Sequence, residues 1–190
     1  MKVRTMLVFL AFCLWVLGSP ARADEPPSAE EMMKAMMPGP AHQDLAKLAG
    51  DYTTKSSFRP APDVEPVTST GTAHLAMILD GRFLAEDNTA EMMGQPVTGK
   101  RLLGYNNSAK HYEGTWMYTM ATGTMRLKGT SPDNGKTIDF EATVDDGKTT
   151  QKLQIIMKRI DDDHFNITLK SQSPEGGAGP SLTTEYTRKK

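Results

Sequence analysis

The sequence predicts an all-β fold, an antiparallel up-and-down β-barrel of about ten strands preceded by a short helical segment. From Tyr52 onward, apolar and polar residues alternate with the period of half-buried strands. Turns rich in Gly, Asn, Asp and Pro separate these stretches, as expected between consecutive antiparallel strands. No helix-length segment interrupts them. A β-sandwich is the alternative, but closure into a barrel removes the exposed edges of an open sheet.

The amino terminus has the pattern of a secretory signal peptide. A basic start precedes an apolar run over residues 6–17, and Ala21 and Ala23 form an Ala-x-Ala cleavage motif. The apolar run is shorter than the ~20 residues that a membrane-spanning helix needs. We therefore expect cleavage before Asp24, with residues 1–23 removed. The mature protein would then be exported to a bacterial periplasm or secreted, with no transmembrane segment.

The predicted mature chain is acidic and contains no cysteine. The whole chain has 22 Lys and Arg and 23 Asp and Glu. Cleavage removes Lys2, Arg4 and Arg22, which leaves 19 basic against 23 acidic residues, a formal charge of −4. It also removes Cys13, so a disulfide or a thiolate nucleophile is not expected. Without a block of basic residues, nucleic acid is not an expected partner.

Two short helices are expected before the strands. In the polar, Met-rich extension over residues 24–40, Ser28 and Glu31 have the spacing of a capping box, and a Pro-Gly-Pro sequence ends the helix. The stretch AHQDLAKLAG then has apolar residues at helical spacing and stops at Gly50. The barrel domain is assigned to residues 41–190.

Each predicted strand has one apolar face. In chain order, these faces contain Ala73, Leu75, Met77 and Leu79, then Tyr112, Trp116, Tyr118 and Met120, then Ile138, Phe140, Ala142 and Val144, then Leu153, Ile155 and Met157, then Phe165, Ile167 and Leu169, and finally Leu182 and Tyr186. The apolar faces are expected to point into the barrel. Trp116, the single tryptophan of the predicted mature chain, should be buried there.

The segment EMMGQPVTGK, which starts at Glu91, raises the choice between a metal site and a tight turn. A turn is favoured, because Gly94 permits an unusual backbone φ and Pro96 supplies a fixed one. Adjacent strand residues point to opposite faces, so Met92 and Met93 cannot both bind one interior metal ion. We assign Met92 to the barrel wall.

Four stretches of the chain resemble a known bacterial family. They are PGPAHQDLAKLAGDY (38–52), STGTAHLAMILDGRFLAED (69–87), EMMGQPVTGKRLLGYNNSAKHYEGTW (91–116) and the closing TTEYTRKK. Together they are similar to the domain of unknown function family 1579. The resemblance implies a lipocalin-like barrel related to the calycin group, and it implies no established activity. The Gly-x-Trp start of lipocalins is replaced here by Gly50-Asp51-Tyr52.

A barrel of this width leaves room for a ligand, so the sequence predicts a non-enzymatic protein that binds a small apolar or amphipathic molecule. The alternative is a periplasmic interaction or stress protein with a solid core. No G-x-S-x-G motif is present, and no cofactor is expected. The candidate pocket residues are Leu75, Met77, Glu86, Met92, Trp116, Tyr118, Met120, Met125, Phe140, Ile155 and Phe165.

Glu86 is the candidate for a less favoured enzymatic role. Its parity with Met92 can turn the carboxylate inward, where burial would raise its pKa and suit it to proton transfer. The same parity turns Phe83 and Ala85 outward. We therefore favour an exposed or salt-bridged Glu86.

Metal and haem binding are weaker alternatives. A helix that carries Met32, Met33, Met36 and Met37 can present thioethers suited to Cu(I), and His42 could add a nitrogen ligand. Methionines of this kind also suit docking of the helix, as a lid over the barrel mouth or against a partner, and we favour docking over copper. A disordered segment is the remaining alternative. His74, His111 and His164 all lie on polar strand faces, and His164, at the start of a strand, is the candidate for haem. No metal site is assigned.

Overall fold

The computed structural model describes residues 28–92, 94–145, 147–172 and 177–190. The expected signal peptide and its cleavage position lie outside these residues, as does Met93. Within the described part of the chain, no helix combines the length and apolar character needed to cross a membrane.

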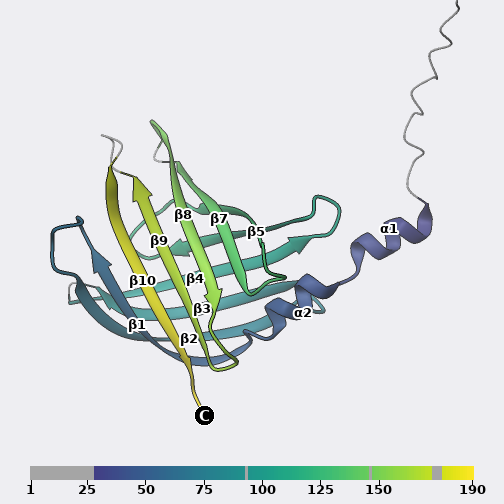
Figure 1. The fold of residues 1–190 in the computed structure, drawn as a ribbon, viewed down its shortest axis with the longest axis horizontal. Coiled ribbons are helices and arrows are strands. Elements are labelled where there is room, and N and C mark those ends of the chain that lie inside the picture. Colours follow the sequence, from purple (N-terminus) through teal and green to yellow (C-terminus); the bar gives the residue numbers. More distant parts are fainter. Residues whose placement is uncertain (1–27, 93, 146, 173–176) are drawn as a thin grey trace, which may run out of the picture.

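Two short helices precede the barrel, as the sequence predicts. In α1 (Ala29–Met36), the Ser28 hydroxyl accepts a hydrogen bond from the backbone N–H of Glu31, and the Glu31 carboxylate accepts one from the backbone N–H of Ser28 at 2.8 Å. This reciprocal pair is the predicted capping box. The second helix, α2 (Pro40–Ala46), packs its buried Leu45 against the barrel, whereas α1 extends away from it (Figure 1).

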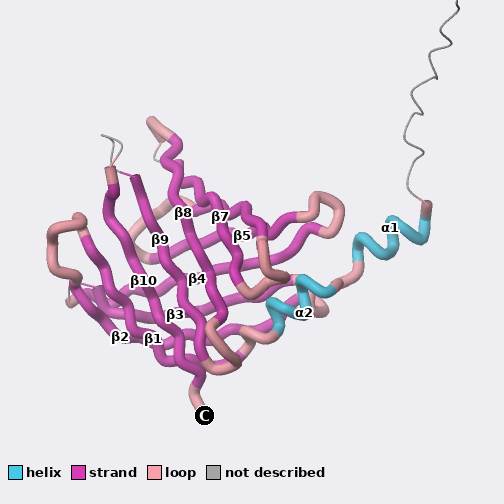
Figure 2. The backbone as a smooth tube through the Cα atoms, viewed as in Figure 1, coloured by secondary structure: helices cyan, strands magenta, loops and turns pink. Residues whose placement is uncertain are grey.

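Ten strands in the described residues form a closed, all-antiparallel barrel (Figures 1 and 2). Each strand pairs with its neighbours in the sequence, and β1 also pairs with β10, which closes the sheet. The predicted up-and-down barrel is therefore confirmed. The strands are β1 (Gly50–Arg59), β2 (Val67–Ile78), β3 (Phe83–Met92), β4 (Gln95–Asn106), β5 (His111–Tyr118), β6 (Met125–Thr130), β7 (Thr137–Asp145), β8 (Thr150–Arg159), β9 (His164–Gln172) and β10 (Ala178–Arg188).

The two ends of the barrel differ, because α2 covers only one of them. At this covered end lie the β2–β3, β4–β5, β6–β7 and β8–β9 turns, and α2 contacts β3 and β4. At the opposite, open end lie the β1–β2, β3–β4, β5–β6, β7–β8 and β9–β10 connections. At one of these, Gly94 has a φ of 76°, the left-handed conformation for which a glycine was expected in the β3–β4 turn.

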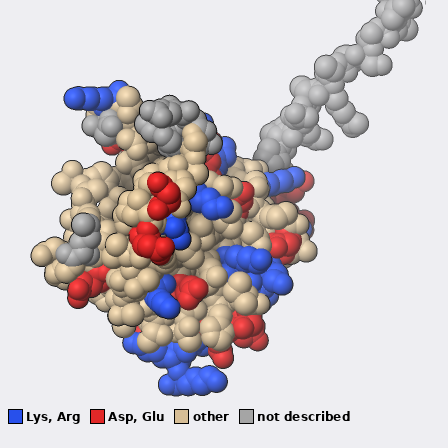
Figure 3. Space-filling model, turned by 60° about the vertical axis from the view of Figure 1, so that its left-hand side comes forward, with Lys and Arg blue, Asp and Glu red and all other residues tan. Residues whose placement is uncertain are grey.

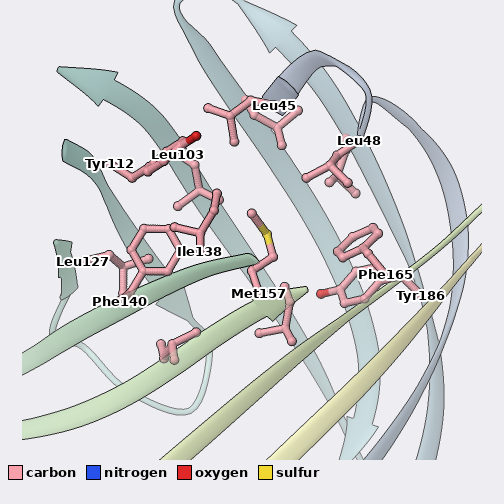
Figure 4. Close-up of a cluster of buried hydrophobic side chains, with 14 of the residues drawn as sticks. Leu45, Leu48, Leu103, Tyr112, Leu127, Ile138, Phe140, Met157, Phe165 and Tyr186 are labelled. Carbon is pink, nitrogen blue, oxygen red and sulfur yellow. The ribbon is translucent and has the colours of Figure 1, made fainter. Parts of the chain in front are cut away.

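The covered half of the barrel is packed solid. Tyr52, Phe165 and Tyr186 form an aromatic group in which Phe165 stacks on Tyr186 at 4.1 Å between ring centroids. The Tyr52 hydroxyl donates a hydrogen bond to the Leu48 carbonyl, so its polar atom is satisfied. Figure 4 shows the inward side chains that fill this half: Leu45, Leu48, Leu103, Tyr112, Leu127, Ile138, Phe140, Met157, Phe165 and Tyr186.

Two residues assigned to apolar strand faces lie outside the core. Leu79 is exposed because β2 ends at Ile78 and the chain turns there, with a φ of 50° at Leu79. Met120 is exposed because β5 ends at Tyr118. Both predictions extended strand alternation into a turn.

Candidate functional site

The open half of the barrel contains a cavity of about 290 Å³. Its apolar wall comes from β5, β6, β9 and β10 and includes Trp116, Tyr118, Met125, Leu169 and Leu182. Strand alternation turns these side chains inward. They do not reach across the barrel, as the side chains of the covered half do. The barrel is therefore solid at one end and hollow at the other.

Polar side chains also line the cavity. They come from Thr54 and Ser56 of β1, Asn88 of β3 and Thr184 of β10. The hydroxyls of Ser56 and Thr184 lie 3.0 Å apart and hydrogen-bond to each other across the β1–β10 pair that closes the barrel. The cavity thus offers hydroxyl and amide groups among a larger number of apolar side chains.

A buried ion pair lies beside the cavity. The guanidinium of Arg101 donates a hydrogen bond to Oε2 of Glu86, and the two side chains are 3% and 2% exposed. The other carboxylate oxygen accepts hydrogen bonds from the Tyr186 hydroxyl at 2.9 Å and from Nδ2 of Asn88 at 3.0 Å. Burial, followed by the negative charge of Glu86, raises the pKa of Tyr186, so its hydroxyl stays protonated and donates.

The strand register explains why these residues meet. In the β3–β4 hairpin Met92 lies opposite Gln95, and the same register places Glu86 opposite Arg101. Both point inward, so the favoured salt-bridged Glu86 is what the structure contains, although buried. Arg101 was missed by the sequence analysis. Counting back from the Gly94 turn would have paired it with Glu86.

Two buried donors next to the cavity have no hydrogen-bond partner in the described part of the structure. They are Nε of Arg101 and Nε1 of Trp116. The guanidinium of Arg101 lies 5.3 Å from the centroid of the Trp116 ring, in cation–π geometry. Buried N–H groups normally have acceptors, so this pair marks a place where an acceptor is favourable.

The described residues that line the mouth of the cavity include no Lys or Arg. Glu91 contributes to the rim, but strand alternation turns its side chain outward, because Ala90 and Met92 on either side of it face inward. A depression of about 630 Å³ adjoins the mouth, sharing Tyr118, Met120 and Met125 with the cavity, and Asp145 lines it. Elsewhere, on the face shown in Figure 3, Lys and Arg side chains are interspersed with Asp and Glu.

The structure divides the predicted pocket residues between the two halves of the barrel. Met92, Trp116, Tyr118, Met120 and Met125 line the cavity, and Glu86 lies beside it. Trp116 is half-buried rather than buried, because it faces this space. The remaining candidates, which face inward but pack in the covered half instead of lining the cavity, are Leu75, Met77, Phe140, Ile155 and Phe165.

The polar residues that line the cavity were not predicted. Thr54, Ser56 and Thr184 alternate with outward residues as apolar core residues do, but their hydroxyls gave no hydrophobic signal. Each lies on the same strand face as a residue that is clearly inward, Tyr52 on β1 and Tyr186 on β10. Extending those faces toward the open end would have located them.

The Met-rich helix does not form the expected lid. Asn107, in the β4–β5 turn at the covered end, donates hydrogen bonds to the carbonyls of Ala35 and Met37. α1 therefore lies at the covered end, away from the cavity mouth. Its four methionines, Met32, Met33, Met36 and Met37, are between 50% and 69% exposed.

His42 does not offer a nitrogen to those methionines. Its Nδ1 accepts a hydrogen bond from the backbone N–H of Gly39 at 3.0 Å, and its ring packs edge-on against that of Tyr105, with 6.2 Å between the ring centroids. Burial lowers the pKa of His42, consistent with a neutral ring that accepts this bond. The Cu(I) set that includes His42 is therefore not assembled.

His164 points away from the barrel interior. Its side chain is about half exposed and Nδ1 lies 2.8 Å from Oδ1 of Asp161, at the covered end. The inward residue of that strand is Phe165, so the haem candidate does not face the cavity. The described residues contain no cluster of three or more His, Cys, Asp or Glu that could hold a metal ion.

Comparisons with known structures show that the barrel has a lipocalin-like fold. The crystal structure of Rv2717c from M. tuberculosis is similar with a TM-score of 0.57 and 17% identity, over 80% of this chain and 99% of that one. The S-type phycobiliprotein lyase CPES from Guillardia theta has a TM-score of 0.54 and 8% identity, over 86% and 99%. At these identities the likeness shows the fold alone. A comparison with curated proteins gave no match.

A family model matches most of the chain. It covers residues 37–188 and is described as a protein of unknown function (DUF1579). The matched region begins just before α2 and ends at the last residue of β10, so it contains the whole barrel and the helix that covers one end. The chain therefore belongs to the DUF1579 family.

Proposed function

We propose that this protein binds a small apolar or amphipathic molecule inside the open half of the barrel, without catalysing a reaction. The cavity of about 290 Å³ carries this proposal, whereas buried side chains of the core fill the covered half of the same barrel. Ligand sites for drug-sized molecules range from ~300 to ~1,000 Å³, so this one suits a small molecule or one end of a longer one.

The cavity wall supports an amphipathic ligand. Trp116 and Tyr118 offer wide apolar surfaces, and the methionines Met92 and Met125 adapt to ligands of different shape. Ser56 and Thr184 provide hydroxyls within the same lining. A ligand with an apolar body and a polar group therefore fits the cavity. The alternative of an interaction protein with a solid core has no comparable support from the open half.

The charged groups beside the cavity support binding rather than chemistry. Glu86 already accepts hydrogen bonds from Arg101, Tyr186 and Asn88. A carboxylate held by three donors serves as a structural acceptor and is poorly placed to take a proton from a ligand. The signal-like amino terminus supports export, so the ligand would be encountered outside the cytoplasm.

Binding of N-phenyl-1-naphthylamine, a neutral dye that fluoresces in apolar surroundings, tests the proposal. We expect saturable enhancement with the unaltered protein. Ala90 lines the cavity, so Ala90→Phe should fill it and weaken dye binding about tenfold or more, a loss of ~1.4 kcal/mol. Ala85 is on the same strand but its parity turns it outward, so Ala85→Phe is the matched control.

Loss of dye binding in both variants, or in neither, would contradict the proposed site. Far-ultraviolet circular dichroism of both variants checks that the barrel is intact. Dye binding that is unsaturable at all concentrations would argue against a defined cavity.

A further inference from the structure

We infer that the cavity selects an uncharged ligand whose inner end carries a hydrogen-bond acceptor, such as a ketone, ester or alcohol, and that it rejects carboxylates. This inference rests on the proposed function and specifies the chemistry of the ligand at the same site. Three observations carry it: the charge balance beside the cavity, the two unused donors, and the absence of Lys and Arg among the described residues at the mouth.

The buried charges beside the cavity cancel. Glu86 and Arg101 are the buried acidic and basic side chains of the described barrel, and they are paired with each other. A carboxylate ligand would therefore meet no free positive charge inside. It would leave water without a counterion, and an ion buried without a partner is strongly disfavoured.

The unused donors favour a neutral acceptor. Nε of Arg101 and Nε1 of Trp116 are buried N–H groups without an acceptor among the described residues. Trp116 lines the cavity, so a ligand there would lie beside its indole ring. A carbonyl or hydroxyl oxygen satisfies such a donor without bringing a net charge into the barrel.

The mouth of the cavity offers no cation to an anion. Asp145 lines the adjoining depression, and the described lining of both spaces includes no Lys or Arg. A carboxylate head left at the mouth would therefore lie near an acidic side chain and near no basic side chain of the lining. Neither orientation of a fatty acid, head inward or head outward, is therefore supported.

Competition against N-phenyl-1-naphthylamine with ligands of one chain length tests this selectivity. The set is 2-decanone, 1-decanol, 1-decene and decanoate, used with the full chain at neutral pH. We expect 2-decanone and 1-decanol to displace the dye at concentrations about tenfold or more below those needed for decanoate, because the carboxylate must be desolvated without a partner.

Two variants separate the contribution of the Trp116 N–H from that of the balanced Glu86–Arg101 charges. Trp116→Phe keeps an aromatic ring but lacks the N–H, so the preference for 2-decanone over 1-decene should fall about threefold to tenfold. Glu86→Gln keeps an acceptor for Tyr186 but leaves Arg101 with an unbalanced positive charge, so decanoate binding should strengthen about tenfold. Glu185→Gln removes an exposed acid from the outer face of β10 and serves as the control.

The outcomes distinguish the inference from the proposed function. If decanoate competes as well as 2-decanone in the unaltered protein, the selectivity is wrong while ligand binding stands. If the dye itself does not bind, the proposed function fails. Should Glu86→Gln not fold, the ligand series with the unaltered protein and with Trp116→Phe still decides.

Discussion

Replacing Arg101 with methionine is expected to destabilise the protein by about 3–5 kcal/mol, because the change leaves the Glu86 carboxylate buried without its cation. Arg101 is 4% exposed, so water cannot take its place easily. The loss would be a large part of the ~5–15 kcal/mol that stabilises a typical domain. Urea denaturation followed by circular dichroism measures it.

The double variant Glu86→Gln/Arg101→Met separates pairing from packing. The amide that replaces the Glu86 carboxylate is neutral and would still accept a hydrogen bond from Tyr186, so most of the lost stability should return. A single-variant loss below ~1 kcal/mol, or a double variant less stable than Arg101→Met alone, would show that the pair does not control the stability of this region.

The second large effect is expected in the covered half. Phe140 is 1% exposed, lies opposite Ile155 on β8, and packs its ring over Gly129 on β6. Phe140→Ala should therefore lower the free energy of unfolding by about 3–5 kcal/mol through lost contacts and a new cavity. The measurement is the urea midpoint, with the slope checked for constancy.

Met120→Ala provides the comparison from the open end. Met120 is 57% exposed at the cavity mouth, so its truncation should change the free energy of unfolding by no more than about 0.5 kcal/mol. Similar losses for Phe140→Ala and Met120→Ala would contradict a barrel that is solid at one end and hollow at the other.

Strand alternation predicted which residues face inward but not where along the barrel they lie. Phe140 and Trp116 both follow the period of two, yet Phe140 is in the packed half and Trp116 lines the cavity. The position of a residue along the barrel axis depends on which end α2 covers and on the shear between strands. That information resides in the packing of Leu45 and Leu48 over the barrel, which alternation along a single strand does not contain.

The polar part of the site was harder to predict than the apolar part. Glu86 was found by parity, but Arg101 was not, because a charged residue on an inward face contradicts the hydrophobic pattern unless its partner is known.

The start of helix α1 could be predicted from the sequence, but its position against the barrel could not. Its capping box specifies where it begins, whereas its position at the covered end depends on hydrogen bonds from Asn107, far away in the chain.

Amide chemical shifts during a titration with N-phenyl-1-naphthylamine test the central claim most directly, by mapping where the ligand lies. A cavity ligand should shift amides of the open half, such as Phe58, Ala90 and Leu182, and the indole N–H of Trp116, with one saturable curve. Amides of the covered half, such as Ile138, should stay unchanged. Shifts confined to α1 or to the outer surface of β7 and β8 would contradict a ligand site inside the barrel.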